Sequence, residues 1–280
     1  MQVFFNNEFV EDDKVHISPF DRGFQFADGI YEVIRYYPRN FFELDAHLKR
    51  LKYGLTELGI TFSNVESLEA ILDELISRNK LSDKTAIAYI QITRGIQRPR
   101  KHSYNNEAVP TFLAYVEELP INYDAINNGV KIGIEQDIRW HRCDIKTIAL
   151  LPNVLSKQKA VRKNLFEIIW HRGGVITEGV QTNIAFVKDD VVYTPPLNNL
   201  ILPGITRQTV LRLCRSLGIQ TSEREILLTE LKHFNEIFLM STTAEITPVI
   251  ELSGAVVSEG VPGKVSKYLQ KEFQKLHTKK

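Results

Sequence analysis

Apolar residues recur at steps of three and four in two early stretches of the chain. In the first stretch, five leucines fall on one face of a helix that the pattern predicts over residues 44–58. Asp45 is a candidate cap for the start of this helix, and Gly59 suits its end. A second helix is predicted over residues 68–76 from the same periodicity.

Two predicted strands follow these helices, at residues 85–93 and 111–116. Both are rich in β-branched and aromatic side chains, which suit a pleated and half-buried surface. The segment between them, residues 95–110, is polar and carries Arg100 and His102. Long loops of this kind are often functional. The first 120 residues are therefore predicted to form a small α/β domain.

The periodicity lapses after this region, and residues 121–129 are the best candidate for an interdomain linker. Beyond it, alternation over 130–140 predicts a half-buried strand. The rest of the pattern predicts further strands in hairpin arrangement and three helices, which begin near residues 152, 206 and 263. Residues 130–280 are thus predicted to form a larger domain of antiparallel strands flanked by helices.

Composition narrows the class of protein. The chain has 280 residues, of which 43% are apolar and 25% are charged, as in ordinary globular proteins. A net charge of +1 gives no electrostatic case for nucleic acid or an acidic membrane. We read no signal peptide and no membrane-spanning stretch, and two cysteines cannot form a disulfide framework. The expected location is the cytoplasm.

Lys146 is the first candidate for chemistry. It stands where the alternating strand pattern ends and just before an apolar run at 148–151. A lysine in such surroundings either extends its ammonium group to water or acts as an amine with a lowered pKa. A neutral amine can form a Schiff base with an aldehyde cofactor. The local sequence leaves both readings open.

Glu178 and Thr206 are two further candidates. Glu178 is flanked by Val and Ile residues, so it is either an exposed strand glutamate or a carboxylate placed against a cofactor. Thr206 follows Gly204 and Ile205 at the start of a predicted helix, where free N–H groups and the helix dipole favour phosphate. Thr206 can equally be the cap of that helix.

Two arginines have local readings that leave function open. Arg100, with His102, fits either a solvated loop or a site for an anionic substrate, because arginine binds a carboxylate through two hydrogen bonds. Arg50 lies outside the leucine face of its helix and reads locally as a surface residue. We find no zinc-ligand spacing, no Gly-x-Ser-x-Gly elbow and no Gly-rich dinucleotide motif.

Taken together and in order, these positions resemble the fold-type IV pyridoxal-phosphate enzymes, and within them the D-amino-acid aminotransferases. The resemblance runs over nearly the whole chain and is carried by ten positions or segments: 21–33, His47, Arg50, 92–95, 137–140, 142–146, 151–158, 177–179, 202–207 and 241–248.

The resemblance implies a two-domain α/β homodimer with pyridoxal 5′-phosphate between the domains and a barrel-like sheet in the larger one. Lys146 is expected to hold the cofactor as a Schiff base and to move the substrate proton. Glu178 is expected to pair with the pyridine nitrogen. The expected phosphate ligands are Arg50, Ile205, Thr206 and Thr242.

Substrate binding is also implied by the resemblance. Tyr31, Arg100 and His102 are expected to hold the α-carboxylate, and the loop that carries Arg100 and His102 is expected to come from the neighbouring subunit. Val33 and Arg35 complete the expected substrate residues. The loop before Arg100 is one residue longer than the family pattern, and residues 180–183 replace a run of serines.

The expected activity is transfer of an amino group from a D-amino acid to 2-oxoglutarate or pyruvate in a ping-pong cycle. Arg35 is more typical of branched-chain aminotransferases, whereas Tyr31 and Val33 depart from the branched-chain pattern. Branched-chain L-amino-acid and (R)-amine transaminases are therefore the alternatives, and aminodeoxychorismate lyase is a more distant one.

Overall fold

The computed structural model describes residues 1–105 and 107–278, and these divide into two compact units. Unit 1 comprises residues 1–120 and 145–150, and unit 2 comprises residues 121–144 and 151–280. Residues 145–150, expected in the second domain, group with unit 1, where their backbone pairs with that of Gly29 and Tyr31. Residues 121–129, expected to be a linker, group with unit 2 and hold helix α4 (Tyr123–Asn128).

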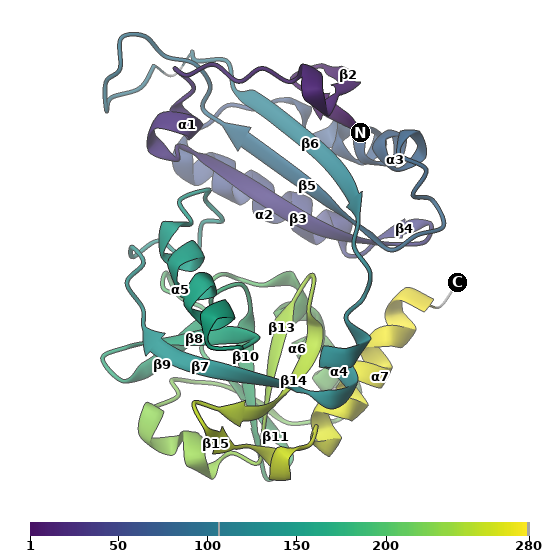
Figure 1. The fold of residues 1–280 in the computed structure, drawn as a ribbon, viewed down its shortest axis with the longest axis vertical. Coiled ribbons are helices and arrows are strands. Elements are labelled where there is room, and N and C mark those ends of the chain that lie inside the picture. The colour runs from purple at the N-terminus through teal and green to yellow at the C-terminus, as the bar shows by residue number, and fades with distance from the viewer. Residues whose placement is uncertain (106, 279–280) are drawn as a thin grey trace. The chain divides into compact units, whose positions relative to one another are not determined.

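Unit 1 is an antiparallel sheet of six strands in the order β2-β1-β6-β5-β3-β4, with helices α2 and α3 against one face (Figure 1). The strands are β1 (Gln2–Phe5), β2 (Glu8–Glu11), β3 (Gly29–Tyr37), β4 (Asn40–Phe41), β5 (Ala86–Thr93) and β6 (Thr111–Glu118). The helices are α1 (Arg22–Phe26), α2 (Leu44–Leu58) and α3 (Leu68–Arg78), with 3₁₀ turns at Asp12–Lys14 and Asn64–Ser67.

The periodicity of both predicted helices is confirmed by the core of unit 1. Leu51 and Leu55 of α2 and Leu72 of α3 are buried against the sheet. Asp45 does not cap α2, because the helix already begins at Leu44. The cap position is Glu43, whose side chain makes no capping hydrogen bond. Asp45 instead lies in the first turn, where its charge is favourable to the helix dipole.

Unit 2 is a nine-stranded mixed sheet whose main path runs β12-β11-β10-β13-β14-β7-β8-β9, with β15 paired to β14. Its strands are β7 (Val130–Gln136), β8 (Glu167–Arg172), β9 (Val175–Gly179), β10 (Asn183–Lys188), β11 (Val191–Thr194), β12 (Thr221–Glu223), β13 (Glu236–Ser241), β14 (Glu245–Leu252) and β15 (Ala255–Val256). Besides α4, its helices are α5 (Leu151–Arg162), α6 (Ile205–Ser216) and α7 (Lys264–Thr278), with 3₁₀ turns at Leu228–His233 and Ser258–Gly260.

The predicted strand at 130–140 ends early, at Gln136. The carboxylate of Asp137 accepts a hydrogen bond from the backbone N–H of Arg139 at 3.0 Å, which closes a turn in place of a further strand pair. This turn brings the side chain of Arg139 back toward the sheet. No helix within residues 1–105 and 107–278 is long and apolar enough to span a membrane.

Candidate active site

Lys146 lies beside the first residues of strand β3 in unit 1. Its carbonyl oxygen accepts a hydrogen bond from the N–H of Tyr31 at 3.0 Å, and the N–H of Ile148 donates to the carbonyl of Gly29 at 3.1 Å. These bonds make 145–150 a short edge segment on β3. The Nζ of Lys146 lies 4.1 Å from the ring centroid of Tyr31, so the structure brings these two predicted site residues together.

Tyr31, Val33 and Arg35 share one face of β3, because side chains alternate along a strand. The ring of Tyr31 stacks with that of Tyr89 on the neighbouring strand β5, at 5.8 Å between centroids. Arg35 is buried, and its Nη1 donates to the carbonyl of Leu119 at 2.6 Å. The guanidinium of Arg35 is therefore engaged with the backbone at the end of unit 1.

Arg50 is not a surface residue: its side chain is only 8% exposed. Its guanidinium donates twice to Glu32 on the opposite face of β3 from Tyr31, with Nε–Oε1 at 2.7 Å and Nη2–Oε2 at 2.8 Å. The ring of His47, one turn earlier on α2, lies 2.9 Å from the same carboxylate. Glu32, on strand β3, thus holds the side chains of Arg50 and His47 of helix α2 in place.

The charges of this cluster follow from its burial. Burial by itself would raise the pKa of Glu32, but the adjacent Arg50 and His47 hold that pKa well below its usual range. Burial lowers the pKa of His47, with Glu32 opposing that shift. A neutral His47 donates from Nδ1, since an ionised carboxylate can only accept. The cluster therefore holds a fixed Glu32–Arg50 ion pair at neutral pH.

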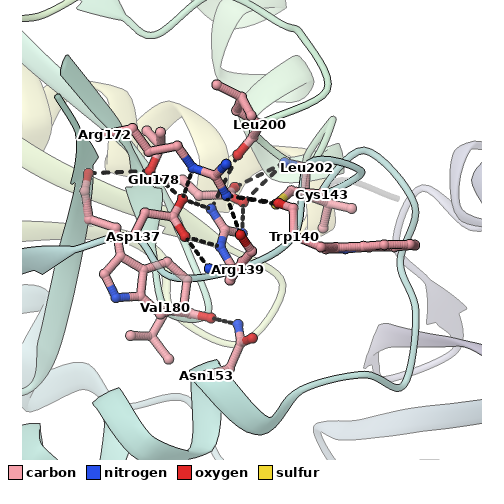
Figure 2. Close-up of polar contacts among 12 residues, drawn as sticks. Asp137, Arg139, Trp140, Cys143, Asn153, Arg172, Glu178, Val180, Leu200 and Leu202 are labelled. Atoms are coloured by element: carbon pink, nitrogen blue, oxygen red, sulfur yellow. Dashed lines mark hydrogen bonds and ion pairs between the residues drawn. The ribbon is translucent and has the colours of Figure 1, made fainter. Parts of the chain in front are cut away.

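Glu178 is the centre of a polar network in unit 2 (Figure 2). It lies in strand β9, is 4% exposed, and is therefore not the exposed strand residue that local sequence allowed. Its Oε1 accepts from Nη1 of Arg139 at 2.6 Å, and its Oε2 accepts from Nδ2 of Asn183 at 2.9 Å. The N–H of Leu202 lies 3.1 Å from both oxygens.

Arg139 is itself held from several sides. Asp137 accepts from its Nε at 3.0 Å and its Nη2 at 2.8 Å, and the guanidinium lies 4.4 Å from the ring of Trp170. Arg172 forms a second ion pair with Asp137 at 3.2 Å (Figure 2). Burial raises the pKa of Glu178, and Arg139 opposes this rise. Arg139 thus favours the charged form of a carboxylate that burial would neutralise.

Helix α6 begins within hydrogen-bond reach of the same network. Asn183 bonds Glu178 and also donates to the carbonyl of Leu202 at 3.0 Å, two residues before Gly204. The cap position of α6 is Gly204, not Thr206, and Gly204 has no side chain to bond the N–H groups of the first turn. Asn183 also pairs with Met240 between β10 and β13, so Thr242 follows just beyond that pair.

These residues suit pyridoxal phosphate on grounds of donor chemistry. A Cβ at Gly204 would collide with Oδ1 of Asn183, so glycine allows the helix start to approach the Glu178 network without displacing Asn183. Within unit 2, Asn183 thus fixes the buried carboxylate of Glu178 relative to the N-terminus of helix α6. A carboxylate suits a pyridinium N–H, and a helix N-terminus suits a phosphate. The cofactor's two polar ends thus each have a matching group.

Arg100 and His102 lie together on the loop 95–110 of unit 1, and both side chains are exposed. Arg100 lies 4.3 Å from the ring centroid of Phe26, and the ring of His102 is 5.5 Å from the same ring. The structure therefore places the two predicted carboxylate-binding side chains on one aromatic residue.

Three residues of the site, Glu32, Arg139 and Asn183, were not expected there from the sequence. Glu32 and Arg139 lie inside motif segments that carry the resemblance, next to Tyr31 and two residues after Asp137. Their charge in otherwise apolar strand patterns was the available signal, but their partners lie far along the chain.

The sequence profile described as amino-transferase class IV matches residues 29–252. The chain belongs to the class IV aminotransferase family, and it is a pyridoxal-phosphate-dependent aminotransferase of fold type IV. The resemblance inferred from the sequence is confirmed, as are the mixed α/β fold class, the enzyme class and the cofactor.

Individual relatives extend the comparison. The D-alanine aminotransferase of Bacillus licheniformis is 41% identical over 275 residues, covering 98% of this chain and 96% of that protein. That of Listeria monocytogenes serotype 4b (strain F2365) is 38% identical and covers 98% and 95%. Among solved structures, the branched-chain amino acid aminotransferase from Escherichia coli superposes with a TM-score of 0.90 at 25% identity, covering 99% of this chain and 94% of that one.

Proposed function

We propose that this protein is a D-amino acid:2-oxo acid aminotransferase that uses D-alanine or D-glutamate as donor and pyruvate or 2-oxoglutarate as acceptor. The observation that carries the proposal is the 38–41% identity, over 98% of the chain, to proteins named D-alanine aminotransferase. The two substrates would react in turn with the same enzyme, in a ping-pong cycle.

When bound, pyridoxal phosphate supplies an aldehyde that condenses with amines and a ring that withdraws electrons from the attached carbon. In this proposal the carboxylate of Glu178 would accept a hydrogen bond from the protonated pyridine nitrogen and keep that nitrogen charged. Arg139 and the N–H of Leu202 favour the ionised form of Glu178 and align its carboxylate for that role. The N–H groups of Ile205 and Thr206 bind the phosphate, together with Thr242.

Arg50 also binds the phosphate in this proposal, and Glu32 and His47 act through it. The Nε and Nη2 of Arg50 both donate to the carboxylate of Glu32. Glu32 therefore orients the guanidinium of Arg50. The buried ion pair fixes the direction of the guanidinium plane before any phosphate arrives.

Lys146 serves as the amine that attaches the cofactor and then as the base. Its Nζ would take the proton from the substrate Cα and give it back as the amino group is transferred. The aromatic face of Tyr31 lies 4.1 Å from Nζ and limits where the amine can swing. Backbone pairing with β3 fixes the peptide from which Lys146 extends. The backbone of Lys146 is thus fixed, while its side chain remains mobile.

Arg100 and His102 bind the substrate α-carboxylate, and Tyr31 and Val33 contact the substrate from strand β3. Arginine and histidine on one loop match a carboxylate, since both can donate to its oxygens. Arg35 lies on the same face of β3 as Tyr31 and Val33 and is the last of the proposed substrate residues.

We propose that the active form is a homodimer. Helix α5 buries the small residues Ser156 and Ala160 and exposes Leu151 (69%) and Val154 (60%), the reverse of an ordinary surface helix. Exposed apolar surface of this kind marks an interaction site, here for a second copy of the chain. Light scattering should give twice the mass of the chain, and Val154→Glu should shift it toward the monomer.

A branched-chain L-amino-acid aminotransferase is the second candidate. It is favoured by the likeness to the Escherichia coli branched-chain enzyme at 25% identity and by arginine at position 35. The higher identity to D-alanine aminotransferases favours the first candidate.

Half-reactions separate the candidates. The purified holoenzyme is mixed with D-alanine, L-leucine or an (R)-amine, and absorbance follows the conversion of bound pyridoxal phosphate to pyridoxamine phosphate. Conversion by D-alanine alone is expected. Conversion by L-leucine alone would establish the branched-chain candidate, and conversion by the (R)-amine alone an amine transaminase. If none of the three converts the cofactor, the D-amino-acid proposal and both alternative donor classes fail, and a lyase reaction is the next one to assay.

A further inference from the structure

The loop that carries Arg100 and His102 is held by Arg22, a buried residue of helix α1. The carboxylate of Asp21 accepts from the N–H of Gly23 at 2.7 Å and so caps α1, which places Arg22 at the first helical position. The side chain of Arg22 is only 5% exposed. Its position in the helix is therefore set locally, whereas its partners come from the distant loop.

The guanidinium of Arg22 contacts the backbone on both sides of His102. Its Nη1 donates to the carbonyl of Lys101 at 2.7 Å and lies 3.5 Å from that of Ser103, and its Nη2 donates to the carbonyl of His102 itself at 3.0 Å. The carbonyls of three successive residues thus converge on one side chain. The peptide that joins Arg100 to Lys101 immediately precedes this anchored stretch.

Asp28 holds Arg22 in this position from the other side. Its Oδ2 accepts from Nε of Arg22 at 2.8 Å and from Nε of Arg94 at 2.8 Å. Arg94 in turn stacks on Tyr104, at 3.6 Å from its guanidinium carbon to the ring centroid, and donates to the carbonyl of Gly59 at 2.9 Å. The loop is therefore fixed at residues 101–103 by Arg22 and at Tyr104 by Arg94.

Helix α1 also supplies the surface on which the two loop side chains rest. Phe26 is the last residue of α1, and it contacts Arg100, His102 and the guanidinium of Arg22, the last at 4.8 Å. Both the backbone and the side chains of the Arg100–His102 pair thus depend on one five-residue helix.

We propose that Arg22 is a positioning residue for substrate binding: it fixes the loop so that Arg100 and His102 present their donors to the substrate carboxylate. This inference rests on the proposed function, because it takes Arg100 and His102 as the carboxylate ligands. Lysine cannot replace Arg22, since a single ammonium lacks the planar fork that reaches Asp28 and the loop carbonyls together. Fixing the side chains of Arg100 and His102 in advance lowers the entropic cost of substrate binding.

The test uses Arg22→Lys and Arg22→Met in the holoenzyme, with Arg78→Met as the control. Arg78 is a half-exposed arginine of α3 that pairs with Glu74 and takes no part in the loop. Loss of hydrogen bonds to a charged group corresponds to about tenfold in affinity. Both Arg22 variants should raise KM for D-alanine and for 2-oxoglutarate about tenfold, while kcat changes less than about threefold. Arg78→Met should leave both unchanged.

Limited trypsin digestion supplies a readout that does not depend on activity. The peptide bonds after Arg100 and Lys101 are trypsin sites in an exposed loop, and cleavage requires the loop to open. The Arg22 variants should be cleaved there about tenfold faster than the wild type or Arg78→Met. Faster cleavage together with raised KM supports the inference. Wild-type KM in Arg22→Lys overturns it, whether or not cleavage accelerates.

Arg100→Ala separates this inference from the proposed function. If Arg100→Ala raises KM and Arg22→Lys does not, only the role of Arg22 is refuted. If Arg100→Ala itself leaves KM unchanged, the carboxylate role of Arg100 is refuted, and the inference fails with it. Should Arg22→Met fail to fold, Asp28→Asn provides a second way to loosen Arg22, and it is expected to raise KM in the same direction.

Discussion

Replacing Arg139 with methionine should destabilise unit 2 and make its stability depend on pH. The methionine retains an apolar stem against Trp170, but it leaves Glu178 without the ion pair at 2.6 Å. Asp137 loses two hydrogen bonds but keeps Arg172 at 3.2 Å and the hydroxyl of Thr177 at 3.1 Å. The main uncompensated charge is therefore Glu178.

The magnitude follows from burial. Removing one partner of a buried ion pair costs about 3–5 kcal/mol. At about 2–4 °C per kcal/mol for a unit of this size, the melting temperature should fall by about 10 °C near neutral pH. Arg139→Lys should lose less, because it keeps a positive charge near Glu178.

The pH dependence has a definite sign. Burial already raises the pKa of Glu178 in the folded protein, and loss of Arg139 removes the group that opposes this rise. The folded variant then binds a proton that the unfolded chain has released, so its stability falls as pH rises toward the folded pKa. The loss relative to the wild type should grow by about 1.4 kcal/mol for each pH unit between the folded pKa of Glu178 in the wild type and its higher folded pKa in the variant.

The assay is thermal unfolding of the apoenzyme, followed by circular dichroism at pH 5, 6, 7 and 8, with Arg78→Met as the control. The cofactor is omitted so that differences in cofactor binding do not enter the melting temperature. An equal loss at all four pH values would refute the assignment of Arg139 as the group that keeps Glu178 ionised. A variant more stable than the wild type would refute the whole energetic argument.

Three further predictions test other parts of the structure. Glu32→Gln should weaken binding of pyridoxal phosphate about tenfold, because Arg50 loses its charged partner; titration of the apoenzyme by fluorescence checks this, and unchanged affinity would contradict it. Gly204→Ala should displace Asn183 from Glu178 and lower kcat, and a wild-type rate would mean that the contact is not needed. Leu72→Ala should cost about 2–5 kcal/mol in urea unfolding, as expected for a fully buried leucine, and a smaller loss would indicate that the core of unit 1 collapses around the cavity.

The sequence indicated which residues belong to the cofactor site, whereas the structure was needed to show the environment of each residue. The order of the motifs pointed to Lys146, Glu178 and Arg50 as cofactor residues, because the family resemblance implies a role toward the cofactor for each of them. The local environment of the same residues was open from sequence, and two simple readings were wrong. Glu178 is buried instead of exposed, and Arg50 is paired inside unit 1 instead of lying on the surface.

Helices α2 and α3 and strands β5 and β6 of unit 1 followed from the sequence by itself, since periodicity is a local property that each segment carries alone. Helix α1 and strand β3 did not. The family and its cofactor also followed from the sequence. The partners of the charged residues did not: Arg139 meets Glu178 across 39 positions, and Arg22 meets Lys101 across 79. Such pairs form only when the strands are paired and the turns are closed in the folded protein. Hydrogen bonds between distant residues depend on that pairing, so only the tertiary structure decided which charges hold the site in place.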